Sequence, residues 1–346
     1  MRLPAFNRIS PAPRGITAGS ADMNVRPAQA SPGAWSSPSL PNLSASHSVQ
    51  AFSLTEMMVT VTLLTVIILG LVAMFDQTRR AFTAGLSQVD VLESGRAAAD
   101  LIGRDLEQLS PAYFASVTNF YSDTPPFYYA NNNFGGTGPV MQPLPSPNAV
   151  EQRTNTLQEL YFLTRNSQQW TAIGYKLDYT NQLNGVATLY RYSMGGLSIT
   201  NATNYYNLTN QLATFTSIWP FTGSNFNRII DGVVHFRVQA FGPNGVTFTN
   251  ISPAALVTNI YTIPPVPGHN NQLDNSYVYA FSSNAVPAFV EVELGILETR
   301  AYQKYMALLT APNAPAAAAY LSNNAARVHI FRQRVPIRSV DPTAYP

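Results

Sequence analysis

The sequence predicts an α+β fold, in which one long N-terminal helix packs on a mostly antiparallel β domain. An uncharged run from Met57 to Phe75 contains no proline, helical spacing continues to Leu109, and beyond Pro111 the apolar residues alternate instead. We therefore expect four segments, which are a leader at 1–51, a membrane or filament-core helix at 52–75, an amphipathic helix at 76–110 and a β-rich domain with long loops at 111–346.

Residues 1–51 are rich in proline, serine and alanine and show neither helical nor strand periodicity. A segment of this composition cannot bury enough apolar surface to offset the entropy of ordering its backbone. We expect it to be disordered and to be removed by cleavage, so it contributes nothing to the fold.

The apolar run begins directly after a single carboxylate, Glu56. At about 1.5 Å per residue, the run from Met57 to Phe75 forms a helix of roughly 28 Å, close to the thickness of a bilayer's hydrocarbon core. One interpretation is an ordinary signal anchor with Glu56 among the headgroups. The other is that Glu56 is kept for a purpose, because a charge next to such a run is costly.

The helix is predicted to continue through 76–109, which contains no proline. A face for packing on the β domain is indicated by apolar residues at helical spacing, namely Ala98, Leu101, Ile102, Leu106 and Leu109. Arg96, Asp100 and Arg104 lie four residues apart on another face, where opposite charges pair. Ser110-Pro111 supplies the end of the helix.

Beyond Pro111 the alternation predicts about six strands, each with one buried and one solvated face. A hairpin is predicted from 173–179 and 188–194, which flank Asn-Gln-Leu-Asn-Gly at 181–185. The remaining candidates are 160–163, 234–240, 288–296 and 328–337.

Long turn-rich segments separate the strands, at 112–154, 195–225 and 244–287. Segments of this length inside a compact domain are usually functional surfaces or mobile. The first is crowded with aromatic residues and asparagine. One interpretation is that loops 112–138 bind a sugar or the surface of another body, and the other is that they pack against their own domain.

The charge balance indicates no nucleic-acid role once the leader is set aside. Four of the twenty basic residues and one of the eighteen acidic residues precede residue 52, which leaves 16 basic and 17 acidic residues in the remainder. There is no cysteine, so disulfides and thiolate metal sites are excluded. The remainder is polar without being charged, as an extracytoplasmic domain can be.

No arrangement of residues predicts catalysis, a metal or a cofactor, so we expect a protein that is not an enzyme. The four histidines, His47, His235, His269 and His329, are far apart in the sequence. Glu291 and Glu293 share one face of a strand and could mimic a catalytic pair, but a solvated sheet face explains them. Asp274 stands in a loop too poor in acids for calcium, and the glycines at 135–138 lack the lysine of a phosphate-binding loop.

The segment Ala51-Phe52-Ser53-Leu54-Thr55-Glu56, followed by an apolar helix, resembles the processing and methylation site of type IV prepilins and type II secretion pseudopilins. The resemblance implies cleavage between Ala51 and Phe52 by a prepilin peptidase, methylation of the new amine of Phe52, and the family's long helix, in which it allows a break near Gly70 or Gly85. Glu56 would then pair with the cationic amine of a neighbouring subunit, because opposite charges neutralise each other in a low-dielectric assembly.

The chain differs from that family in three respects. Ala51 stands where the family usually has glycine, the leader is 51 residues long, and residues 44–51 carry no lysine or arginine. Arg79 and Arg80 instead follow the apolar run, and a translation start at Met23 would shorten the leader.

The segment from Arg96 to Leu106 also resembles the helix end of J-type minor pseudopilins. Together these resemblances imply a pilin-like subunit in the bacterial inner membrane, single-pass, with its globular domain on the periplasmic or extracytoplasmic side. Its expected partners are other pilin or pseudopilin subunits. The alternatives are a tip-displayed binding protein that uses loops 112–138 and, as a third class, a membrane-anchored hydrolase.

Overall fold

A computed structural model describes residues 52–125, 141–143, 152–167, 169–178, 186–198, 202–217, 225–248, 259–263, 265, 276–309 and 314–345. Residues 66–346 belong to one compact unit, and the described residues 52–65 belong to another. The predicted leader lies outside the described residues.

Helix α1 runs from Leu54 to Leu106 without interruption, so the prediction of one long helix is confirmed. Gly70 and Gly85, near which the resemblance allows a break, both lie inside the regular helix. The helix ends three residues before the predicted Leu109. Hydrogen bonds from residues three positions later close its last turn, and the Leu109 N–H donates to the Leu106 oxygen at 3.0 Å.

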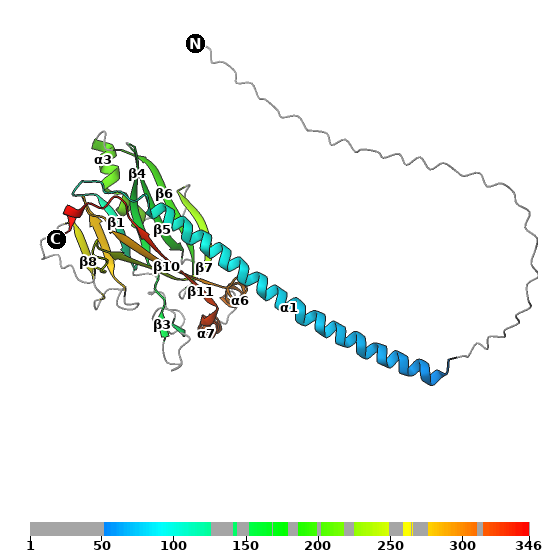
Figure 1. Ribbon diagram of the computed structural model, residues 1–346. Helices are drawn as coiled ribbons and strands as arrows, with labels where there is room; N and C mark the ends of the chain where they lie inside the picture. The colour runs from blue at the N-terminus through cyan, green and yellow to red at the C-terminus, as the bar shows by residue number, and fades with distance from the viewer. Residues whose placement is uncertain are drawn as a thin grey trace, which may run out of the picture. The chain divides into compact units, whose positions relative to one another are not determined.

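The β domain is built on a nine-stranded antiparallel sheet (Figure 1), so the α+β prediction is confirmed at this level. The strand order is β11-β10-β7-β6-β5-β4-β1-β9-β8. The strands are β1 (Thr118–Asp123), β4 (Glu159–Asn166), β5 (Gln169–Asp178), β6 (Ala187–Leu197), β7 (Phe226–Phe241), β8 (Ile260–Ile263), β9 (Val278–Ser282), β10 (Phe289–Leu297) and β11 (Val328–Pro336). A separate two-stranded sheet pairs β2 (Met141–Pro143) with β3 (Gln152–Thr154).

Every strand that the alternation predicted is present. The predicted hairpin is β5 paired with β6, and Asp178 lies opposite Thr188 at its described end. The strands β4, β7, β10 and β11 match the other candidates. The segments predicted to be turn-rich hold further structure, which is β1, β2 and β3 in the first, helices α3 (Ala202–Thr209) and α4 (Gln211–Ser217) in the second, and β8 and β9 in the third.

The prediction that each strand has one solvated face is wrong for β10, which lies next to the edge strand β11. In β10 every residue from Val290 to Leu297 is buried. One face of this part of the sheet packs on α1. On the other face, helices α6 (Thr299–Leu309) and α7 (Ala314–Asn323) share a core with Val234 and Leu297. A 3-10 turn (Ala325–Arg327) leads into β11, and another (Pro342–Ala344) follows it.

The second half of α1 packs on the sheet through the face that the sequence predicted. Val91, Ala98, Ile102 and Leu106 are buried in the main core together with residues from both halves of the sheet. Gly95 lets the helix approach β11 closely, because a Cβ added there would lie 2.1 Å from the Phe331 ring.

A buried carboxylate also joins α1 to the sheet. Asp105 accepts hydrogen bonds from the Tyr175 hydroxyl at 2.6 Å and from Arg191 Nε at 2.6 Å. Burial and the adjacent carboxylate raise the pKa of Tyr175, while the hydrogen bond to Asp105 raises the pKa of Arg191 despite its burial. The neutral phenol and the charged guanidinium are therefore both favoured beside the Asp105 carboxylate.

Candidate functional sites

The first candidate site is the start of α1, where Glu56 lies in the first turn and is exposed. Ser53 precedes the helix, and its Oγ accepts from the Glu56 N–H at 3.2 Å. A serine with a glutamate three residues later is the spacing of a capping box, and an anionic side chain in a first turn also interacts favourably with the helix dipole. Glu56 therefore has a local role in beginning this helix, whatever else it contacts.

The helix surface that follows Glu56 is apolar and uncovered. Every large hydrophobic side chain described from Leu54 to Phe75 is at least 50% exposed. The helix contains one candidate membrane span, and none of that span is buried by the described chain. A soluble monomer would not leave such a surface in water. This arrangement fits a single-pass membrane protein.

The predicted processing residues lie at this same end. Phe52 is 75% exposed and Ala51 lies outside the described residues. Cleavage between them and methylation of Phe52 stay predictions.

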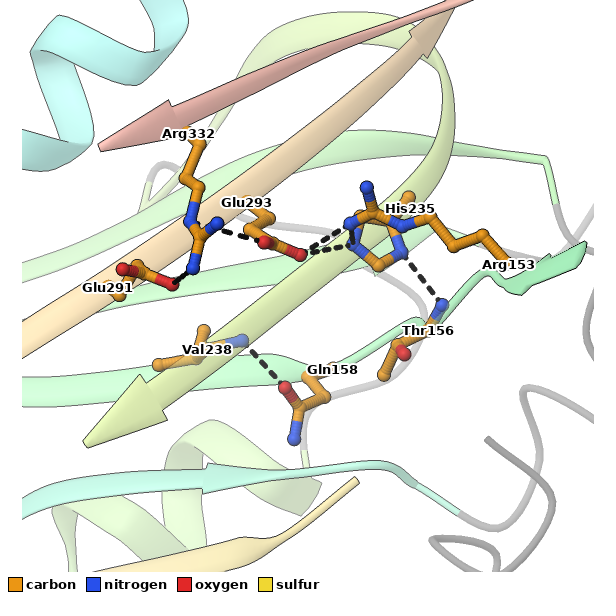
Figure 2. Close-up of polar contacts among 8 residues, drawn as sticks. All are labelled: Arg153, Thr156, Gln158, His235, Val238, Glu291, Glu293 and Arg332. Atoms are coloured by element: carbon orange, nitrogen blue, oxygen red, sulfur yellow. Dashed lines mark hydrogen bonds and ion pairs between the residues drawn. The ribbon is translucent and has the colours of Figure 1, made fainter. Parts of the chain in front are cut away.

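The second candidate site is a charged cluster around two buried glutamates, which the sequence did not predict (Figure 2). We call it the charged cluster, and it consists of Arg153, His235, Glu291, Glu293 and Arg332. Its residues come from β3, β7, β10 and β11. Figure 2 shows Glu293 between Arg332 on one side and His235 with Arg153 on the other, while Glu291 lies beyond Arg332.

The expectation that Glu291 and Glu293 lie on a solvated face is wrong, since each is only 6% exposed. Arg332 forms an ion pair with Glu291, and its Nε lies 3.4 Å from Glu293 Oε1. Arg153 forms a second ion pair with Glu293. The polar side of the alternation thus faces counter-charges rather than water.

His235 is held by two different hydrogen bonds. The Thr156 N–H donates to Nδ1 at 2.9 Å, which places the proton of a neutral ring on Nε2. Nε2 lies 3.1 Å from Glu293 Oε2 and donates to it. Arg153 also lies 2.8 Å from Nε2, but two donors cannot bond to each other. Its guanidinium therefore donates to Glu293 instead.

The electrostatics of the charged cluster favour a neutral histidine and an ionised glutamate. Burial lowers the pKa of His235, and this outweighs the hydrogen bond to Glu293. Burial also acts to raise the pKa of Glu293, but the His235 hydrogen bond and the charges of Arg153 and Arg237 outweigh it and lower that pKa to about 2. His235 is therefore a neutral imidazole, and Glu293 is an ionised carboxylate.

This geometry gives the charged cluster a structural role. Its two carboxylates pair with Arg153, His235 and Arg332, and a separate contact nearby is the Val238 N–H, which donates to Gln158 at 2.7 Å (Figure 2). Through Arg153 and Thr156, the segment that includes β3 is fixed to β7 and β10. The shifted pKa values follow from these internal pairs, so they do not by themselves indicate catalysis.

The other sites considered from the sequence are only partly described. His47, His269, Asp274 and the glycines at 135–138 lie outside the described residues. His235 and His329 are described, and within the described ranges no group of three histidine or acidic side chains is arranged to hold a metal ion. That the protein is not an enzyme stays a prediction.

The aromatic residues of loops 112–138 that are described contact their own domain. Phe120 is fully buried beside Phe281, with ring centroids 5.7 Å apart, and Phe114 meets Tyr205 edge to face at 5.6 Å. Tyr113 is 58% exposed. Phe127, Tyr128, Tyr129 and Phe134 lie outside the described residues.

Two buried ion pairs were missed by the sequence analysis. One is Asp105 with Arg191, and the other is Lys176 with Glu159, whose charged atoms lie 3.4 Å apart with both side chains almost fully buried. Asp105 carried a usable signal, since it falls at helical spacing on the buried face of α1. Its partner on the sheet carried none.

No protein-family model matches this chain, and no curated protein is significantly similar to it.

Proposed function

We propose that this chain is a pilin-like subunit, processed before Phe52, whose N-terminal helix joins it to neighbouring subunits in a type II secretion pseudopilus or a type IV pilus-like filament. The observation that carries the proposal is the single carboxylate of Glu56 at the start of an apolar helix surface that the described chain leaves uncovered. The role is mechanical, and the chain contributes a helix and a folded domain to an assembly.

The apolar surface of the helix has to be covered both before and after the subunit enters the filament. Before assembly, the lipid of the bacterial inner membrane covers it, because its length suits the hydrocarbon core. After assembly, the helices of neighbouring subunits replace the lipid. In this scheme residues 76–346 lie on the periplasmic or extracytoplasmic side, which suits a domain that is polar with few charges.

Within such an assembly, the Glu56 carboxylate would form an ion pair with the cationic amine of Phe52 of a neighbouring subunit. An ion pair in a low-dielectric surrounding is strong when it is complete, and removal of one partner leaves an uncompensated charge. The local capping role of Glu56 is compatible with this, since the serine hydroxyl binds the Glu56 backbone and leaves the carboxylate exposed.

The test separates these two roles of Glu56. Glu56→Gln removes the charge and keeps a residue that the capping box accepts at this position. Glu93→Gln is the matched control, because Glu93 is an exposed carboxylate on the same helix. The cells should contain the cognate filament system, and both variants should be inserted in the membrane.

We expect Glu56→Gln to lower the amount of this subunit in the sheared filament fraction about tenfold or more, since a desolvated charge pair is lost. The Glu93→Gln variant should assemble like the unaltered chain. Normal incorporation of Glu56→Gln would refute the proposed assembly contact.

A further inference from the structure

The last strand of the sheet, β11, offers an edge that differs from the opposite edge. Among the described strands, the sheet ends at β11 on one side and at β8 on the other. Strand β8 spans only Ile260–Ile263, which is one of the ways in which proteins blunt an edge. Strand β11 has nine residues, its only proline is the terminal Pro336, and its register with β10 shows no bulge.

The hydrogen bonds at the two ends of β11 determine which of its main-chain groups point outward. The Ile337 N–H donates to the Ala288 oxygen at 2.9 Å, and the Glu298 N–H donates to the Arg327 oxygen at 3.1 Å. In a regular antiparallel pair, the odd-numbered residues of β11 therefore bond to β10. The outward N–H and C=O groups belong to Val328, Ile330, Arg332 and Arg334, and we call these groups the β11 edge.

The two faces beside the β11 edge differ in chemistry. On one face, a groove of about 530 Å³ runs between α1 and β11, with an apolar lining of Val89, Leu92, Ala97 and Phe331. Val89 is 58% exposed and Leu92 is 48% exposed, so this apolar surface is open to water. Three charged residues of α1 border the groove.

The other face presents arginine. The Arg332 side chain is 61% exposed, while Glu291 and Glu293 beneath it are almost fully buried. Arg334 is exposed and stacks its guanidinium over Phe289, with 4.8 Å between the guanidinium carbon and the ring centroid. The carboxylates are inside and the guanidinium groups are outside, so the surface that meets solvent beside the edge is cationic.

We propose that the β11 edge binds an extended segment of another protein in which acidic and apolar residues alternate. Such a segment would add a strand to the sheet and bond to the outward main-chain groups of β11. Because side chains of a strand alternate between faces, every second residue would meet Arg332 and Arg334, and the residues between them would enter the groove beside Leu92 and Phe331.

The positive charge beside the β11 edge favours an acidic segment over a second copy of this chain. Two β11 strands paired edge to edge would bring arginine rows together, which is destabilising. The proposal concerns a surface of the β domain and does not depend on Glu56 or on filament assembly, so either proposal can fail without the other.

The test uses the full chain in detergent micelles and the dye-labelled peptide TEVDVEIDVET, with binding followed by fluorescence anisotropy. We expect saturable binding that weakens as salt is added. A peptide of the same composition with its acids gathered at one end should bind at least about tenfold more weakly, because it cannot match both faces.

Two further peptides test the strand addition directly. One is N-methylated at every acidic residue and the other at every apolar residue. An added strand directs alternate N–H groups toward β11, so one of these peptides should lose about tenfold or more in affinity while the other still binds.

The site is located with Arg334→Glu, which should weaken binding by about tenfold or more through like-charge repulsion. Arg334→Gln gives a milder change, and Arg300→Glu is the control, because Arg300 is exposed on α6. Absence of saturable binding, or equal effects of Arg334→Glu and Arg300→Glu, would overturn the proposal. Equal binding of both N-methylated peptides, together with competition by an anionic polysaccharide, would also overturn it and leave only a cationic patch.

Discussion

The contact between Asp105 and the sheet provides the sharpest stability prediction. Asp105→Ala removes a carboxylate whose side chain is 9% exposed, together with hydrogen bonds to Tyr175 at 2.6 Å and to Arg191 at 2.6 and 3.2 Å. Tyr175 is fully buried, so its hydroxyl would lose its partner in a place that water does not reach. Breaking a buried pair costs about 3–5 kcal/mol.

The lower end of that range applies here. The Arg191 side chain is 22% exposed, so part of its guanidinium can turn to water when the carboxylate is lost. We expect Asp105→Ala to lower the free energy of unfolding by about 3 kcal/mol, which corresponds to a fall in Tm of roughly 6–10 °C for a domain of this size.

The assay is thermal unfolding of the full chain in micelles, followed by near-UV circular dichroism, because this signal comes from packed aromatic side chains of the β domain. Asp100→Ala is the matched control, since Asp100 is an exposed carboxylate on the same helix α1. The control should change stability by less than about 0.5 kcal/mol. A loss below about 1 kcal/mol for Asp105→Ala would refute the reasoning that this contact fixes α1 to the sheet.

Two further predictions concern the charged cluster and the helix glycines. The folded-state pKa of Glu293 is lowered from 4.5 to about 2, so its ionisation contributes stability above pH 4.5 that is lost as the pH falls toward 2. Glu293→Gln should be less stable by on the order of 3 kcal/mol at pH 7, and denaturant titrations at several pH values should show this deficit shrinking between pH 5 and 2; a constant deficit would contradict the assignment. Gly95→Ala should lower stability by about 1–3 kcal/mol in the same thermal assay, because its Cβ would overlap the Phe331 ring, whereas Gly85→Ala, with open space around it, should not destabilise the helix. Equal effects at the two glycines would show that the approach of α1 to β11 is looser than described.

The sequence was sufficient to predict the helix and the principal strands because their periodicities are strong. Ala98, Ile102 and Leu106 recur at helical spacing and are buried against the sheet. The two strands of the β5–β6 hairpin alternate cleanly on either side of a turn-forming segment, and they pair as expected. In both cases the local pattern and the tertiary packing agree.

The short strands could not be predicted in the same way. Strand β8 has four residues, too few for alternation to be distinguished from chance, and β1 carries asparagine and serine, which favour turns. Asn119 is buried in β1 because its side chain donates to the Ser283 and Ala285 carbonyl oxygens at 2.8 Å. These partners lie more than 160 residues away, so no local pattern reveals them.

The error over Glu291 and Glu293 has a similar cause. Alternation shows that one face of β10 is polar, but it cannot distinguish water from arginines supplied by β3 and β11. At the other end of the chain, Glu56 was evident as a candidate from the sequence because it stands alone before the apolar run. Its hydrogen-bonded cap from Ser53 became clear only from the geometry.

The most direct test of the proposed function is mass spectrometry of the amino terminus of the mature protein, purified from cells that contain a prepilin peptidase. The proposal predicts a chain that begins at Phe52 and carries one methyl group on its α-amine. An intact leader, or cleavage at another position, would contradict it.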